Sequence, residues 1–109
     1  MNARSDDNVD LVNKYLRAQN LEQVGRDDEA VGLYEAAVAQ HFDSAGPYDR
    51  LIAIYANRAA HKEVVRVAQA ALGSVKTYDD KRAWYEAQRR EALKAQSRLP
   101  QAAPRKRPS

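Results

Sequence analysis

The histidine and acidic residues of this chain are the first candidates for chemistry, but their spacing does not assemble a reactive site. His41 and His61 lie far apart in the sequence, and neither belongs to an HExxH or HxH pattern that would bind a metal ion. The acidic run at residues 27–29 lacks the alternating oxygen ligands and the glycine of a calcium loop. We interpret this run as the acidic first turn of a helix, and we predict no metal site.

The cysteine, glycine and serine patterns argue against further classes of enzyme. The chain has no cysteine, which excludes a thiol nucleophile, a disulfide scaffold and a zinc site built on thiolates. Its four glycines are isolated and form neither GxxxxGK[ST] nor GxGxxG, the loops that bind phosphates. No serine has a GxSxG setting. We therefore expect a protein that is not an enzyme and that needs no cofactor.

Charge is unevenly distributed along the chain. Residues 1–75 contain 8 basic and 11 acidic side chains, and residues 76–109 contain 10 basic and 4 acidic ones, so the net charges are −3 and +6. The basic residues that form this C-terminal excess include Lys81, Arg82, Arg89, Arg90, Lys94, Arg98, Arg105, Lys106 and Arg107.

This basic segment makes nucleic-acid binding an alternative function. Clustered Lys and Arg attract phosphate backbones with marked salt dependence. However, only Trp84 and Tyr85 are available to stack on bases, and no recognition motif is present. A solvated tail that aids solubility or contacts an acidic partner is the simpler interpretation.

The elements that would position these residues are all predicted to be helices. Proline, which breaks helices, occurs only at positions 47, 100, 104 and 108. Apolar residues recur at three- and four-residue spacing within segments rich in Ala, Arg, Glu and Gln. These patterns predict an all-α fold of about five helices over residues 9–98, arranged as antiparallel hairpins. We expect residues 1–8 and 99–109 to be disordered.

Capping and stop residues predict where the helices begin and end. The first helix is expected over about residues 9–24, with Asn8 as its N-cap and Gly25 as its stop. The fourth is expected to stop near Gly73, and the fifth to run to roughly Arg98. The remaining starts are predicted at Asp27 or Asp28, at Pro47, after the join at residues 59–61, and at Thr77, which has capping-box spacing with Asp80.

The sequence also repeats itself at an offset of 34 residues, which is the pattern of a repeat protein. The segment that begins at Gly25 aligns with the segment that begins at Ala59. The aligned pairs are Glu29 with Glu63, Val31 with Val65, Leu33 with Val67, Ala36 with Ala70, Ala37 with Ala71 and Val38 with Leu72.

A helix-turn-helix unit of this length is the period of the tetratricopeptide repeat, and the chain resembles that family over about residues 11–78. The resemblance rests on Gly25, Asp28, Glu29, Ala30, Tyr34, Ala37, Tyr48, Leu51, Tyr55, Glu63, Ala71 and Leu72. It implies a short solenoid with repeats at about 11–44 and 45–78 and a C-terminal capping helix at 78–98. A non-repeat bundle made of the same five helices is the alternative fold.

The resemblance also implies a function, namely a non-catalytic adaptor that binds a peptide or a helix of a partner protein in a concave groove. By family position, the residues that would line this groove are Tyr15, Gln19, Glu22, Gln23, Asp49, Arg50, Ala53 and Asn57. The family's carboxylate clamp for acidic chaperone tails is not reproduced, because Tyr15 and Asp49 stand where lysine or asparagine would be.

Size and hydropathy add two expectations. Two repeats and a cap are fewer than the roughly three repeats that a stacked array needs to be stable alone. We therefore expect a homo-oligomer, or docking on a larger partner, through the first helix, where Val9, Leu11 and Val12 exceed what one packed face requires. No apolar run is long enough to cross a membrane and no secretory signal is present, so a cytoplasmic location is expected.

Overall fold

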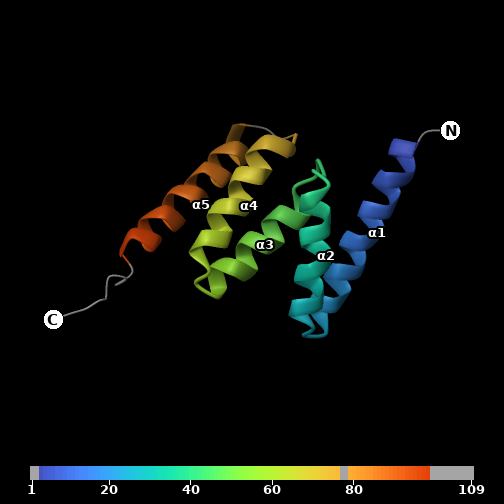
Figure 1. Ribbon diagram of the computed structural model, residues 1–109, viewed down its shortest axis with the longest axis horizontal. Coiled ribbons are helices and arrows are strands. Elements are labelled where there is room, and N and C mark those ends of the chain that lie inside the picture. Colours follow the sequence, from blue (N-terminus) through green and yellow to red (C-terminus); the bar gives the residue numbers. More distant parts are fainter. Residues whose placement is uncertain (1–2, 77–78, 99–109) are drawn as a thin grey trace.

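Five α-helices follow one another in a row, and each packs against the next (Figure 1). The computed structural model describes residues 3–76 and 79–98. The helices are α1 (Ala3–Gln23), α2 (Asp27–Ala39), α3 (Gly46–Asn57), α4 (His61–Ser74) and α5 (Asp79–Arg98). Over these two ranges the chain contains no strand, and the prediction of an all-α fold made of helical hairpins is confirmed.

The hairpins α1/α2 and α3/α4 are closed by the same turn. Gly25 and Ala59 both adopt left-handed backbone conformations, with φ of 82° and 55°. In each turn the next residue, Arg26 or Ala60, donates its N–H to a carbonyl in the last turn of the preceding helix, at 2.8 Å in both cases. This pattern is the Schellman motif, which satisfies carbonyl groups at a helix end. The two turns lie 34 residues apart, so the sequence repeat is also a repeat of backbone conformation.

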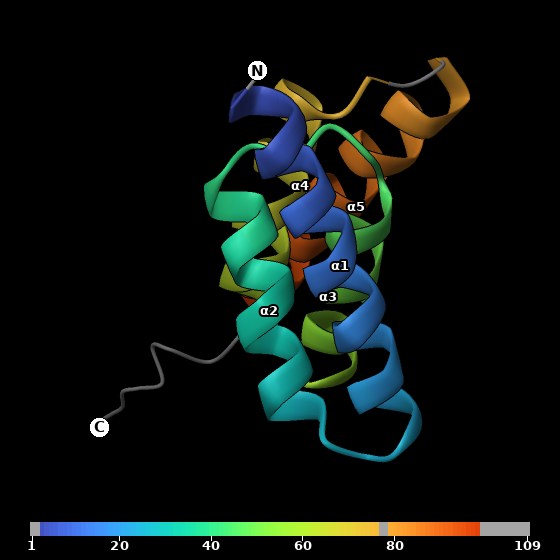
Figure 2. The same cartoon turned by 90° about the vertical axis from the view of Figure 1, so that its right-hand side faces the viewer.

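Small residues and tyrosines fill the space between the helices. Viewed from the α1 and α2 end in Figure 2, these two helices lie side by side in front of the remaining three. Alanine lets neighbouring backbones approach closely, and the phenol rings fill the space that alanine leaves. The residues with no exposed surface include Ala18, Ala30, Tyr34, Ala37, Tyr48, Leu51, Val67, Ala68, Ala71 and Tyr85.

Helix α1 begins earlier than the sequence pattern predicted. It starts at Ala3 rather than near Val9, so residues 3–8 are helical and not disordered. Asn8 therefore lies inside the helix and is not its cap. No proline or glycine interrupts this segment of the sequence.

The start of α2 also differs from the prediction. The N-cap is Arg26, whose side chain makes no capping hydrogen bond, while Asp27 and Asp28 are the first helical residues. Three residues, Val24, Gly25 and Arg26, separate the two helices, and the guanidinium of Arg26 donates to Glu29 at 2.6 and 2.8 Å instead of capping α2. The other starts were better predicted, since Pro47 lies in the first turn of α3 and α4 begins at His61.

Two further predictions fall at the ends of helices. Helix α4 continues through Gly73 and ends at Ser74, and α5 ends at Arg98 as expected. The predicted capping box depends on Thr77, which lies outside the described residues, as does the segment 99–109.

One apolar residue of α1 is placed differently from the expectation. Leu11 is buried with Ala37 and Phe42, so it is not part of an exposed docking face. Val9 and Val12 are exposed, as expected, and Leu16 is exposed with them. The apolar surface that α1 leaves open is therefore made by these three residues.

Candidate interaction surface

Four of the predicted groove residues meet where α1 lies next to α3. Gln19, Glu22 and Gln23 of α1 surround a hollow of about 270 Å³ together with Arg50 of α3. The guanidinium of Arg50 donates to both carboxylate oxygens of Glu22, at 2.9 and 2.6 Å. The structure thus brings these residues together, but it pairs the two charged ones with each other.

Glu22 has a further partner on α2. The hydroxyl of Tyr34, a residue whose ring is fully buried, donates to the Glu22 carboxylate at 2.6 Å. The hydrogen bonds from Arg50 lower the pKa of Glu22, burial opposes this effect, and the Tyr34 hydrogen bond adds to it. Burial, together with the neighbouring carboxylate, raises the pKa of Tyr34. One ionised carboxylate therefore connects three helices.

Tyr15 supports this cluster rather than standing open in a groove. Its hydroxyl accepts a hydrogen bond from the Gln19 side chain at 2.9 Å, and its ring lies 6.0 Å from that of Tyr34. The ring also lies directly against Gly46, where any larger residue would meet it. Tyr15 is therefore a half-buried packing residue between α1, α2 and α3.

Asp49, another predicted groove residue, connects α3 to α5. Its carboxylate accepts a hydrogen bond from the Tyr85 hydroxyl at 2.8 Å and forms an ion pair with Lys81, also at 2.8 Å. Tyr85 is fully buried, and burial raises its pKa, followed by the hydrogen bond to Asp49. Ala53 and Asn57, the last two predicted groove positions on α3, are exposed.

A second cluster of tyrosine, glutamate and arginine connects α2, α3 and α4, and sequence reasoning missed it. Tyr55 donates its hydroxyl to Glu35, and the guanidinium of Arg66 donates to the same carboxylate at 2.5 and 3.1 Å and to Glu63 at 2.7 Å. Burial raises the pKa of Tyr55 to about 12, with the Glu35 hydrogen bond as the next cause. These partners are 20 and 31 residues apart, so no local spacing pattern signals them.

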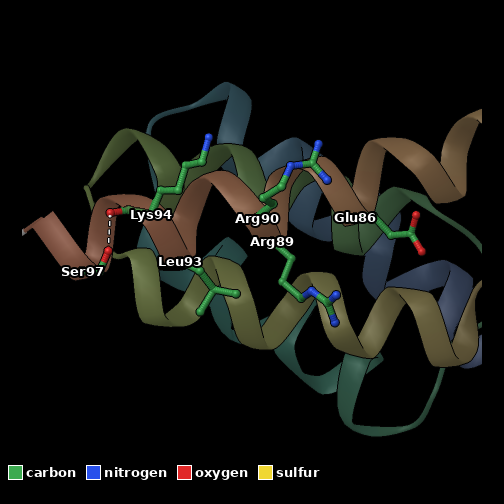
Figure 3. A pocket seen from close by; sticks show the side chains of 6 residues that line it. All are labelled: Glu86, Arg89, Arg90, Leu93, Lys94 and Ser97. Carbon is green, nitrogen blue, oxygen red and sulfur yellow. Dashed lines mark hydrogen bonds between the residues drawn. The ribbon is translucent and has the colours of Figure 1, made fainter.

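A different surface, on α5, contains Arg89 and Arg90, which form no ion pair with any residue in the described ranges. Six residues of this helix line a hollow of about 480 Å³, namely Glu86, Arg89, Arg90, Leu93, Lys94 and Ser97 (Figure 3). Arg98, predicted as part of a basic tail, is the last residue of α5. The other predicted tail residues, Arg105, Lys106 and Arg107, lie outside the described part of the chain.

Comparison with known proteins assigns this chain to no family. No protein-family model, curated protein or solved structure matches this chain. Within residues 3–76 and 79–98, no group of three or more His, Cys, Asp or Glu residues is placed to hold a metal ion. Among the helices described, none is long and apolar enough to cross a membrane.

Proposed function

We propose that the chain is a tetratricopeptide-like interaction module that binds a peptide or a helix of a partner protein on the surface formed by α1 and α3. The observation that carries this proposal is the recurrence of one Schellman turn, at Gly25 and again at Ala59, which closes both hairpins at the family's period. We expect the module to act in the cytoplasm without catalysis or a cofactor.

The available contacts on this surface are mostly neutral. Glu22, Arg50 and Asp49 are already engaged in hydrogen bonds that connect helices. Arg50 is exposed although it is engaged, and the exposed predicted groove residues outside these hydrogen bonds are Gln23, Ala53 and Asn57. A partner on this surface would therefore gain hydrogen bonds and packing rather than new ion pairs, and its binding should change little with salt concentration.

The experiment that tests this function places a photocrosslinking amino acid at Asn57, on the proposed surface, or at Gln40, just after the end of α2. Both positions are exposed, so neither replacement should disturb the fold. Crosslinked partners are then identified by mass spectrometry. A protein captured from position 57 and not from position 40 would support the proposal.

A matched pair of substitutions provides the control. Ala53→Arg places a bulky side chain on the surface and leaves both Glu22 and Arg50 unmutated. Ala39→Arg makes the same substitution at the end of α2. We expect Ala53→Arg alone to abolish the specific crosslink. Equal capture from both positions, or no effect of Ala53→Arg, would contradict the proposal.

The proposed partner is another protein, and a second copy of the chain is one form that it could take. Val9, Val12 and Leu16 leave an apolar surface on α1. Sedimentation velocity at several protein concentrations distinguishes the two cases. A mass that rises with concentration, and that falls in Leu16→Ser, would identify a homo-oligomer, whereas a constant monomer mass would leave only a different protein as the partner.

A further inference from the structure

Two arginines of α5 differ from four arginines earlier in the chain in their partners. Arg26, Arg50, Arg58 and Arg66 each lie within 3.0 Å of a carboxylate oxygen. By contrast, neither Arg89 nor Arg90 forms an ion pair with any residue in the described ranges, whereas Lys94 on the same surface pairs with Glu91 at 3.6 Å. Arg89 and Arg90 are therefore not neutralised by carboxylates within the part of the chain that the structure describes.

Arg89 is the most informative of these residues. Its Nε is buried, yet this atom donates no hydrogen bond within the described part of the chain. A buried guanidinium N–H without an acceptor is costly, because it has lost water without gaining a partner. The contacts within the described residues therefore leave this N–H unsatisfied.

An apolar side chain lies next to these cations. Leu93 is one turn beyond Arg89, and 48% of its surface is exposed. In Figure 3, Arg89 and Leu93 extend from α5 toward α4, while Arg90 and Lys94 extend away from it. The hollow thus offers one apolar contact with cationic groups on two sides.

We infer that this face of α5 binds an acidic amphipathic helix of a partner protein. Carboxylates of that helix would pair with Arg89 and Arg90, and one of its apolar side chains would cover Leu93. The lining from Glu86 to Ser97 is about 16 Å long, which accommodates roughly three turns of a helix. The chain's own C-terminal sequence offers no charge complementarity to this surface, because Arg105, Lys106 and Arg107 carry the same sign of charge.

The same residues favour a peptide over nucleic acid. The carboxylate of Glu86 lies in the lining, where it would repel a phosphate and a carboxylate alike, so it does not distinguish the two ligands. The aromatic side chains nearby are not free to stack on bases, because Tyr85 is fully buried and Lys81 lies 4.2 Å above the ring of Trp84. A phosphate group would also provide no apolar surface to cover the Leu93 side chain.

Binding is tested with the full chain and a fluorescent synthetic helix of roughly four turns that is rich in Glu and carries Leu at every fourth position. Fluorescence anisotropy measures its affinity. We expect Arg90→Glu to weaken binding about tenfold or more, which corresponds to about 1.4 kcal/mol. Leu93→Ser should weaken it several-fold without any change in charge.

The matched control is Lys62→Glu, which makes the same change in net charge at an exposed position on α4. It should change the affinity less than about twofold, as should Ala53→Arg on the other proposed surface. The inference is therefore independent of the function proposed for α1 and α3.

Two results would overturn the inference. One is equal weakening by Lys62→Glu and Arg90→Glu, or no effect of Leu93→Ser, because binding would then reflect overall charge alone. The other is tighter binding of a labelled single-stranded DNA oligonucleotide than of the acidic helix at the same salt concentration. That outcome would assign the surface to nucleic acid.

Discussion

At the scale of single residues, Glu22 is the predicted groove residue whose carboxylate connects α1 to both α2 and α3. It accepts hydrogen bonds from Arg50 and Tyr34, and only 16% of its side chain is exposed. Glu22→Gln keeps the shape of the side chain and removes its charge. We expect this substitution to lower the free energy of unfolding at pH 7 by about 1 to 2 kcal/mol, as measured by urea denaturation.

The pH dependence of this difference provides the control. The pKa of Glu22 in the folded protein lies below its ordinary value of 4.5, so the stabilisation is fully present above pH 4.5 and is lost as the pH falls through the folded pKa. The difference between wild type and Glu22→Gln should therefore shrink toward zero in acid. A difference that persists at low pH would show that the charge is not its cause.

Gly46 gives a second prediction at this scale, because its missing side chain makes room for Tyr15. A methyl group at Gly46 would overlap the Tyr15 ring, with the phenol oxygen only 2.6 Å away. Gly46→Ala should destabilise the protein by about 1 to 3 kcal/mol. At Gly32, inside α2, a methyl group meets nothing within 4 Å, and Gly32→Ala should stabilise the protein by up to about 1 kcal/mol.

Thermal unfolding of both glycine variants checks these opposite signs. In a Tyr15→Ala background the overlap is absent, and Gly46→Ala should then lose its destabilising effect. Persistent destabilisation in that background would point to the backbone at the start of α3 instead of the tyrosine.

At the scale of helices, the attachment of α5 depends on Tyr85. This residue is fully buried and donates its hydroxyl to Asp49 of α3. Tyr85→Ala should cost about 3 to 5 kcal/mol of stability, and Tyr85→Phe, which keeps the ring, about 1 to 2 kcal/mol. Chemical denaturation followed by the fluorescence of Trp84, the only tryptophan, measures both values. Equal losses would show that the hydroxyl alone matters.

The helices and their turns were largely predictable from sequence, whereas the polar connections between them were not. Gly25 can adopt the left-handed conformation that ends α1, and Pro47 can start a helix but not continue one, so local conformation made both positions predictable. The partners Glu22 and Arg50 are 28 residues apart, and only the packing of α1 near α3 brings them together. The burial of Leu11 likewise depends on Phe42, beyond the end of α2.

At the scale of the whole molecule, the net charge can be changed without altering the sequence of the five helices. Deleting residues 99–109 removes Arg105, Lys106 and Arg107 and reduces the formal net charge from +3 to zero. We expect the truncated chain to be less soluble near pH 7, where it carries no net charge. Its affinity for the acidic helix should be unchanged, because the proposed face lies within α5. Solubility measurements and the same anisotropy assay check the two halves of this prediction.

The polar connections described above are staggered along the row of helices. Glu22 and Arg50 connect α1 to α3, Glu35 and Arg66 connect α2 to α4, and Asp49 and Lys81 connect α3 to α5. In a row of helices held only by contacts between neighbours, the terminal helix would unfold before the others. Couplings that skip one helix oppose such fraying, so amide hydrogen exchange in the second half of α1 should require nearly the same opening free energy as exchange in α3.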